Sequence, residues 1–133
     1  MEAKQRKKVL IVDNNEGVRG TLQSVLGRVG SDTRTTWSGH EALELLASEE
    51  FDVLVVDDYL PDLHCSEFLN LVGKLPVQPW IVVMQASMPT TKDFLRYASL
   101  GAFSVVRKHH ITEVCKAVSS CCADEPLVKT SIN

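Results

Sequence analysis

Three stretches of this chain follow apolar runs and hold the side chains best suited to chemistry. They contain Asp13, Asp57 and Lys108. Clustered carboxylates favour a hard divalent cation such as Mg²⁺, which takes oxygen ligands, keeps several waters and usually accompanies a phosphate. A lysine is a compact charge suited to a phosphoryl oxygen, and a carboxylate can attack phosphorus and become an aspartyl phosphate. If the three stretches meet in the folded chain, they predict a site that accepts a phosphoryl group.

The elements that would carry these side chains alternate between strand-like and helix-like patterns. We expect strands over Lys8–Val12, Asp32–Thr36, Val53–Val56, Trp80–Met84 and Phe103–Val106, and helices over Glu16–Val29, Gly39–Ala47, Cys65–Gly73, Thr91–Ser99 and Ile111–Cys122. Runs that are apolar on both faces are typical of a parallel sheet covered by helices on both sides. The second strand is rich in threonine, which predicts a polar strand at the edge. The pattern therefore predicts one α/β domain with a doubly wound, five-stranded parallel sheet and five helices.

The carboxyl ends of such strands can bring distant residues together. In an open parallel sheet, ligands bind beyond these ends, where Asp13, Asp57 and Lys108 would follow the first, third and fifth strands. Asp13 and Asp57 converge if their strands are neighbours. Adjacent side chains at a strand end tend to point apart, so we expect Asp58 to lie outside the pocket. A plainer interpretation stays open for each acid alone, namely that it ends a strand and caps the following helix.

Length and composition narrow the class of protein. The 133 residues fit one domain, with a basic leader over 1–7, the domain itself over 8–122, and a tail or the start of a linker over 123–133. The net charge of −3 argues against general nucleic-acid binding. No apolar run approaches the roughly 20 residues that cross a bilayer, and the apolar run after the basic start is too short for a signal peptide. We therefore expect a cytoplasmic protein without a membrane partner.

The four cysteines form no C-x-x-C pair, and no histidine lies at zinc-like spacing from them. Cysteines of cytosolic proteins are normally reduced. We expect structural thiols, with redox sensing as the alternative.

Several motifs together carry a family resemblance over residues 8–122. They are VLIVDNNEGVR, GHEALELL, FDVLVVDDYLPD, PWIVVMQA and GAFSVVRKHH. The chain resembles a response-regulator receiver domain of two-component signalling. The resemblance implies a flavodoxin-like fold with strand order 2-1-3-4-5. It also implies a protein partner that donates the phosphoryl group, either a histidine kinase or a phosphotransfer protein, and a downstream protein or output domain that reads the result.

The resemblance also assigns roles to particular residues. It implies that Asp57 is the phosphoacceptor and that Lys108 contacts the phosphoryl group. Mg²⁺ would be held by Asp13, Asp57, the backbone carbonyl of Tyr59 and Asn14. The family usually has a second acid where this chain has Asn14, whose amide oxygen can still ligate a metal although one negative charge is lost.

The chain departs from the family's pattern at the positions that relay phosphorylation. Gln85 replaces the switch threonine or serine, although its amide can also donate a hydrogen bond. Val105 replaces the aromatic residue that swings inward, and Phe103 lies two positions earlier. His109 replaces a proline whose bond to the lysine is often cis; a cis bond to a non-proline residue is costly, so we expect a trans bond. The usual relay is therefore missing.

Two functions follow from these features. The first is a phosphorylatable switch with an atypical relay, in which Asp57 is loaded and protein contacts change. The alternative is a degenerate receiver that binds proteins without phosphorylation. We do not expect an enzyme: a phosphatase with an aspartate nucleophile needs a second acid two residues later, and Tyr59 occupies that position. We expect no DNA binding by this domain, and dimerisation through the last helix stays open.

Overall fold

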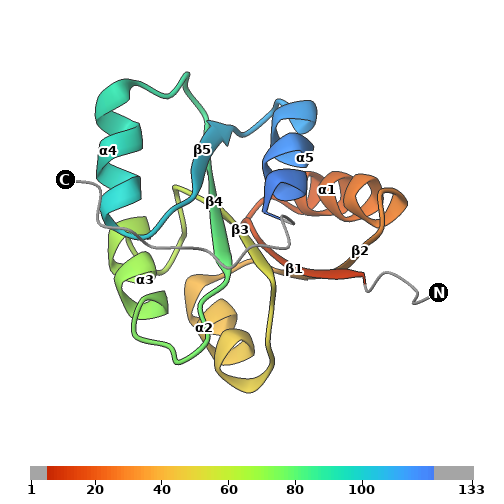
Figure 1. Cartoon of the computed structure of the whole chain (residues 1–133), viewed down its shortest axis with the longest axis horizontal. Coiled ribbons are helices and arrows are strands. Elements are labelled where there is room, and N and C mark those ends of the chain that lie inside the picture. Colours follow the sequence, from red (N-terminus) through yellow and green to blue (C-terminus); the bar gives the residue numbers. More distant parts are fainter. Residues whose placement is uncertain (1–5, 122–133) are drawn as a thin grey trace.

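The computed structural model describes residues 6–121, and it follows the predicted alternation of strands and helices (Figure 1). The strands are β1 (Lys7–Val12), β2 (Ser31–Thr36), β3 (Val53–Asp57), β4 (Trp80–Gln85) and β5 (Ser104–Arg107), and the helices are α1 (Glu16–Arg28), α2 (Gly39–Ser48), α3 (Cys65–Val72), α4 (Thr91–Ser99) and α5 (Ile111–Ser120). Most of the expected leader, the expected tail and Cys122 lie outside the described residues. Lys7, assigned to the leader by its charge, is the first residue of β1.

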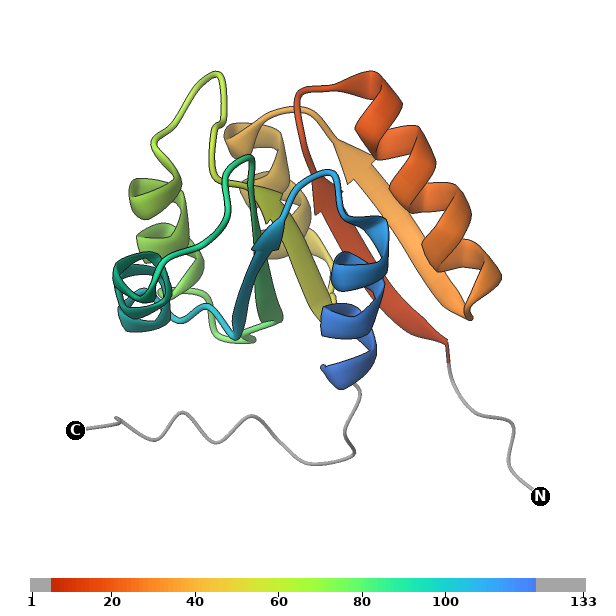
Figure 2. The ribbon, with the colours of Figure 1, turned by 90° about the horizontal axis from the view of Figure 1, so that it is seen from above.

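The five strands form one parallel sheet in the order β2-β1-β3-β4-β5, which confirms the predicted topology. Figure 2 shows the strands side by side with helices on both sides. β1 pairs with both β2 and β3, and β2 is the polar edge strand that its threonines predict. β1 and β3 are therefore direct neighbours, as the convergence of Asp13 and Asp57 requires.

Each face of the sheet buries its own apolar layer. Alternate strand residues point to opposite faces, and most strand interiors are apolar on both. One layer packs α2, α3 and α4 against the sheet through Leu10, Val12, Ala42, Leu54, Val56, Phe68, Leu69, Val83 and Tyr97. The other packs α1 and α5 through Val9, Ile11, Leu22, Leu26, Val55, Val82, Met84, Val114 and Val118. Burial on both faces holds the strand ends in fixed register, and this register positions the site.

Local signals set the ends of the helices. Ser38 caps α2 by accepting a hydrogen bond from the backbone N–H of Glu41. Gly30, which follows the end of α1, has a φ of +97°, a conformation that few other residues adopt. β5 begins at Ser104, one residue later than expected, because Phe103 instead turns outward and packs edge-on against Trp80 at 4.9 Å between ring centroids.

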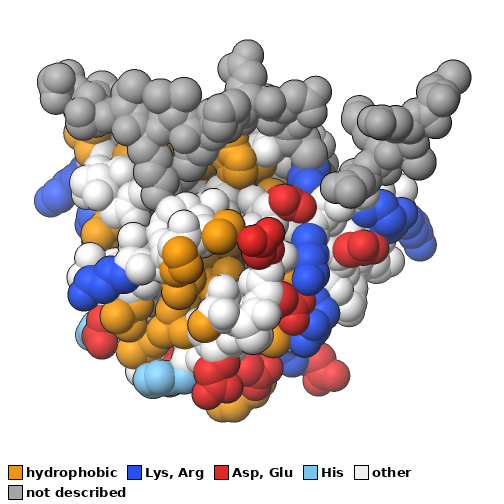
Figure 3. Space-filling model, turned by 60° about the horizontal axis from the view of Figure 1, so that its bottom comes forward, with side chains coloured by type: hydrophobic (Ala, Val, Ile, Leu, Met, Phe, Trp, Pro, Cys, Tyr) orange, Lys and Arg blue, Asp and Glu red, His pale blue; other side chains and the backbone are white. Residues whose placement is uncertain are grey.

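The surface over α2 and α3 mixes hydrophobic and charged side chains (Figure 3). Among residues 6–121, no helix has the length and apolar content needed to cross a membrane.

Candidate functional site at the carboxyl rim of the sheet

The three chemically suited side chains meet at one point of the rim. Asp13 directly follows β1, Asp57 ends β3, and Lys108 follows β5. The Lys108 Nζ atom lies 2.6 Å from Asp57 Oδ2 and 3.2 Å from Asp13 Oδ2. The backbone N–H of Lys108 donates to the carbonyl oxygen of Gln85 at 2.8 Å, which fixes the lysine beside the end of β4. One ammonium group therefore bridges two carboxylates from strands far apart in the sequence.

The two carboxylates are deeply buried for charged groups. Asp13 is fully buried and Asp57 is 2% exposed. Asp13 Oδ1 accepts a hydrogen bond from the backbone N–H of Asn15, whereas its Oδ2 has no well-aligned hydrogen bond and interacts with Lys108 as an ion pair. Burial raises the pKa of Asp13, and the negative charge of Asp57 adds to this effect. The rim therefore holds two buried carboxylates close together, and the surrounding hydrogen-bond donors leave one of their oxygens, Asp13 Oδ2, without a hydrogen bond.

Lys108 is held as a cation by its partners. Burial alone would lower its pKa, but the hydrogen bond to Asp57 and the charges of Asp57 and Asp13 raise the pKa above its ordinary value. A lysine in this state is a fixed positive charge beside the carboxylate that ends β3.

Asp58 lies closer to Asp57 than strand alternation predicts. The chain bends at Asp58, directly after the last residue of β3, so the rule that adjacent side chains point apart no longer holds. The two carboxyl groups are close enough to share a hydrogen bond when one is protonated. Burial, followed by the charge of Asp57, raises the pKa of Asp58 to about 6. Asp58 nevertheless forms no cluster with Asp13 and Asp57 among residues 6–121, so the expectation that it lies outside the pocket stays a prediction.

The donor set at the rim suits a hard cation that keeps several waters. Asp13 and Asp57 supply carboxylate oxygens, of which Asp13 Oδ2 is buried without a hydrogen bond. The backbone N–H of Tyr59 donates to Asp57 Oδ1 at 3.2 Å, and this hydrogen bond keeps the main chain of Tyr59 close to the carboxylate. Asn14 is exposed. Within residues 6–121, no group of three or more acidic, histidine or cysteine side chains gathers around a common point, so any metal here would depend on water and main-chain oxygens, as Mg²⁺ commonly does.

The positions of the expected relay have distinct environments. Gln85 is 4% exposed, and its amide nitrogen is directed toward α4. Val105 is buried within the core layer of α2, α3 and α4. The described residues contain no cis peptide bond, so Lys108 and His109 are joined in trans as expected. Phe103 packs on Trp80 at the far end of β5 and does not stand in for the missing aromatic residue.

Three further polar residues shape the site, and sequence reasoning missed them. Asp62 accepts hydrogen bonds from the backbone N–H groups of Gly39 and His40, so the loop after β3 caps α2. Glu113 accepts from the backbone and guanidinium of Arg107, which ties the start of α5 to the end of β5. Asp93 completes a capping box with Thr90, and that contact has a sequence signature. The first two are long-range or loop contacts without one.

The described cysteines support the structural interpretation. Cys65, Cys115 and Cys121 are free thiols. Burial raises the pKa of Cys65 and of Cys121 to about 12, which disfavours the reactive thiolate.

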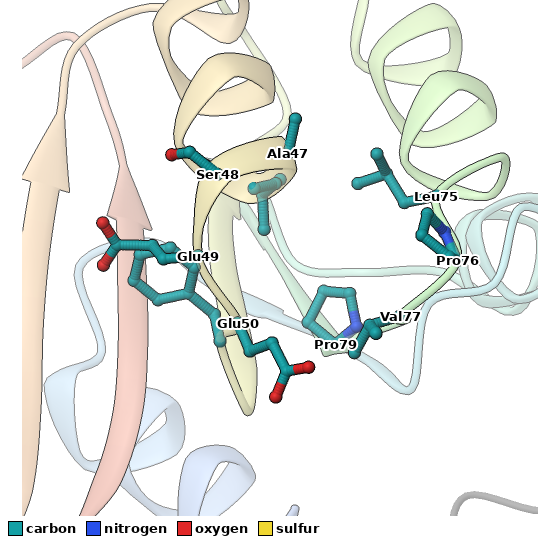
Figure 4. A pocket seen from close by; sticks show the side chains of 10 residues that line it. Ala47, Ser48, Glu49, Glu50, Leu75, Pro76, Val77 and Pro79 are labelled. Atoms are coloured by element: carbon teal, nitrogen blue, oxygen red, sulfur yellow. The ribbon is translucent and has the colours of Figure 1, made fainter.

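A pocket of about 300 Å³ lies at the opposite end of the sheet, between the segments that lead into β3 and β4 (Figure 4). Its lining is largely apolar, with Leu46, Leu75 and Pro79 among the contributing residues. Of its two glutamates, Glu49 is engaged by Lys8 and Arg34. This pocket contributes nothing to the acidic rim.

Comparison with known sequences places the chain in a family. Residues 9–119 match the response regulator receiver domain. The chain is 47% identical over 105 residues to the response regulator protein PilR of Pseudomonas aeruginosa, a match that covers 77% of this chain and 23% of PilR. It is 26% identical over 100 residues to the DNA-binding transcriptional regulator NtrC of Azospirillum brasilense, covering 75% of this chain and 21% of NtrC. The chain thus spans less than a quarter of the length of these two relatives.

Solved structures show the same flavodoxin-like fold. The chemotaxis response regulator CheY4 of Vibrio cholerae superposes with a TM-score of 0.82 at 22% identity, over 88% of this chain and 99% of that one. A response regulator protein from Burkholderia pseudomallei, solved with a phosphorylated aspartic acid, a calcium ion and citrate, has a TM-score of 0.72 at 26% identity, over 84% of this chain and 65% of that one. Receiver domains are signalling modules and generally not enzymes. The family match, the identity with PilR and the shared fold show that the chain belongs to the response regulator receiver domains of two-component signalling.

Proposed function

We propose that this receiver domain accepts a phosphoryl group on Asp57 from a histidine kinase or phosphotransfer protein and changes its contacts with a downstream protein or output domain. The observation that carries the proposal is the 2.6 Å contact between Lys108 Nζ and Asp57 Oδ2, with Asp13 on the other side of the ammonium group. The structure from Burkholderia pseudomallei, which contains a phosphorylated aspartic acid, supports the same chemistry in a related fold.

The transfer needs a nucleophilic oxygen and a donor with a labile bond to phosphorus. A carboxylate oxygen of Asp57 attacks the phosphorus of a phosphohistidine; an O–P bond forms, the N–P bond breaks, and its electron pair returns to the imidazole nitrogen. Receiver domains in general bind Mg²⁺, and a bound Mg²⁺ would neutralise charge on the transferring oxygens. Asp13, Asp57, the backbone carbonyl of Tyr59 and Asn14 are the residues that would hold it.

Lys108 supplies charge stabilisation from the chain itself. Its ammonium group already lies against Asp57, and transfer of a phosphoryl group replaces the single negative charge of this carboxylate with a phosphoryl group that carries about −1.5 to −2 charges. The lysine can then exchange its contact with the carboxylate for one with a phosphoryl oxygen, because its flexible stem and three donors adapt to a nearby acceptor. Asp13 keeps the ammonium group close throughout.

The alternative function is phosphorylation-independent protein binding. The departures Asn14, Gln85, Val105 and His109 favour it, because the chain lacks one acid of the usual metal pocket, both parts of the usual relay and the proline after the lysine. The two functions require the same fold and differ in whether Asp57 becomes phosphorylated.

Incubation with Mg²⁺ and a small acyl phosphate, followed by intact-mass measurement, separates the two functions. We expect the mass to rise by one phosphoryl group in the wild type, and to stay unchanged in Asp57→Asn and in the wild type with excess chelator. A wild-type mass that stays unchanged at millimolar donor would favour the binding module.

A further inference from the structure

The buried Gln85 side chain links the phosphorylation rim to α4. Its amide nitrogen lies 3.0 Å from Asp93 Oδ2, in the first turn of α4, and 3.2 Å from Ser87 Oγ. Gln85 is 4% exposed, so few water molecules can replace these contacts. The backbone carbonyl oxygen of Gln85 meanwhile accepts a hydrogen bond from the backbone N–H of Lys108. One residue therefore contacts both the lysine of the rim and the start of the helix.

Asp93 is the residue on which the start of α4 depends. Its carboxylate accepts the backbone N–H of Thr90, while its own backbone N–H donates to the hydroxyl of Thr90, which completes a capping box. The hydrogen bond from the Thr90 backbone, followed by that from the Gln85 amide, lowers the pKa of Asp93. Both bonds converge on the same oxygen, so a change at Gln85 alters the cap directly.

We propose that Gln85 acts as a pin that holds the first turn of α4 while Asp57 is unloaded and releases it when a phosphoryl group arrives. The release, unlike the pin, rests on the function proposed above. In this way Gln85 couples the rim to α4 by a route that needs neither a hydroxyl at its own position nor an aromatic residue at Val105.

The release follows from competition for a single amide group. A phosphoryl group on Asp57 presents three strong acceptor oxygens and about −1.5 to −2 charges, in place of the single charge of the carboxylate, next to Lys108, whose backbone N–H is bonded to the backbone carbonyl of Gln85. The Gln85 amide has two donor hydrogens, and the new acceptor draws it away from Asp93. The Asp93 carboxylate is then left with Thr90 and with Arg96 at 3.9 Å. The first turn of α4 loosens, and the exposed side chains of Phe94 and Leu95 shift with it.

The pin is tested first without any phosphoryl group. Gln85→Met keeps the length of the side chain and removes its donors. We expect the amides of the first turn of α4 to exchange hydrogen about three to ten times faster than in the wild type, as for the loss of one hydrogen bond of ordinary strength. The exposed Gln23 of α1 provides the matched control, because Gln23→Met should leave this exchange unchanged. Unchanged protection of the strands verifies that both variants are folded.

A second variant distinguishes the hydrogen bond from packing. Gln85→Glu places a second carboxylate against Asp93 and should speed exchange as much as Gln85→Met or more. Combining it with Asp93→Asn restores one donor and one acceptor across the contact, and exchange should return to within about twofold of the wild type. Wild-type exchange in Gln85→Met, or no recovery in the double variant, would overturn the pin.

The release is tested with beryllofluoride and Mg²⁺ as a phosphoryl mimic. Exchange in the first turn of wild-type α4 should rise to the level of Gln85→Met, while Gln85→Met itself should show no further rise. Intact mass after treatment with acyl phosphate reports loading separately. If Asp57 is loaded and α4 does not respond, the release is wrong; if Asp57 is never loaded, the proposed function and the release both fail, and the exchange of the unloaded variants still decides the pin.

Discussion

Two groups of carboxylates in this domain are stabilised in opposite ways. At the rim, burial raises the pKa of Asp13 and of Asp58, and neighbouring negative charge adds to the effect. At the start of α2, Asp62 is an exposed residue; the slight burial of its carboxylate acts to raise its pKa, but the backbone N–H groups of His40 and Gly39 and the ring of His40 lower the pKa below its ordinary value. Asp58 and Asp62 are only four positions apart in the sequence, so residue type alone does not separate the two groups.

The difference shows which acids serve the fold and which serve the site. A carboxylate that accepts several N–H donors stabilises the folded state in its ionised form. A buried carboxylate with a raised pKa lowers the stability of the folded state when it ionises, and such groups gather at functional sites. At the rim, the ammonium group of Lys108 offsets the negative charges of Asp13 and Asp57. The charge of Asp62 is instead stabilised by backbone N–H groups at the start of the helix that it caps.

The largest expected effect comes from removing that ammonium group. Lys108→Met leaves Asp13 and Asp57 buried without their common partner, and we expect the free energy of unfolding to fall by roughly 2 to 3 kcal/mol at neutral pH. Mg²⁺ should recover most of the loss, because it supplies positive charge at the same carboxylates. Urea unfolding with chelator and with Mg²⁺ measures both. A loss of less than about 0.5 kcal/mol in chelator would show that the rim carboxylates do not depend on Lys108.

Removing the capping acid should be the next largest effect. Asp62→Asn keeps the shape of the side chain and loses the charge that faces the first turn of α2, so stability should fall by about 1 kcal/mol. Urea unfolding at neutral pH provides the value. The exposed Glu44 of α2 offers a control, since Glu44→Gln should change stability by less than about 0.5 kcal/mol. Equal effects of the two substitutions would argue against the cap.

The same substitution at the rim should act in the opposite direction. Asp13→Asn removes a buried charge with a raised pKa, while its amide oxygen can still accept from Asn15, so stability should rise by about 1 kcal/mol in the absence of metal. Its affinity for Mg²⁺ should fall at the same time. Unfolding in chelator, with a Mg²⁺ titration in parallel, tests both statements. Destabilisation as large as that of Asp62→Asn would remove the distinction between the two groups.

The smallest effect is a change in pH dependence caused by Asp58. Its folded-state pKa of about 6 lies above the ordinary value, so the folded state binds a proton more tightly than the unfolded chain. Stability from this group is therefore present at low pH and is lost as the pH rises through about 6. Between about pH 5 and about pH 7.5, the wild type should lose up to about 1 kcal/mol more stability than Asp58→Asn, after allowance for the partial exposure of Asp58. Parallel curves for the two proteins would contradict this.

Much of the fold could be predicted because the signals are local or periodic. Four apolar runs and one threonine-rich run located the five strands to within one residue at either end, and the threonine-rich run predicted an edge. The meeting of Asp13, Asp57 and Lys108 also followed, because parallel strands end at one rim. The proximity of Asp58 to Asp57 could not be predicted, because the alternation rule applies within a strand and the chain bends where the strand stops.

The contacts that could not be predicted join side chains to distant backbone or to loops. The cap of α2 by Asp62 spans 23 positions in the sequence for Gly39, and no local signature announces it. The direction of Gln85 depends on where the first turn of α4 lies, which only the folded chain defines. The resemblance to receiver domains identified Gln85 as an unusual residue at its position, and the structure shows that its side chain donates to Asp93.

The central claim is that Asp57 is the residue that becomes phosphorylated, and reductive trapping tests it most directly. Borohydride reduces an aspartyl phosphate to homoserine, so treating the protein after incubation with acyl phosphate and Mg²⁺, then sequencing its peptides by mass spectrometry, locates the acceptor. We expect homoserine at position 57 and at no other position. Homoserine at position 13 or 58, or its absence despite a mass increase of one phosphoryl group, would contradict the account.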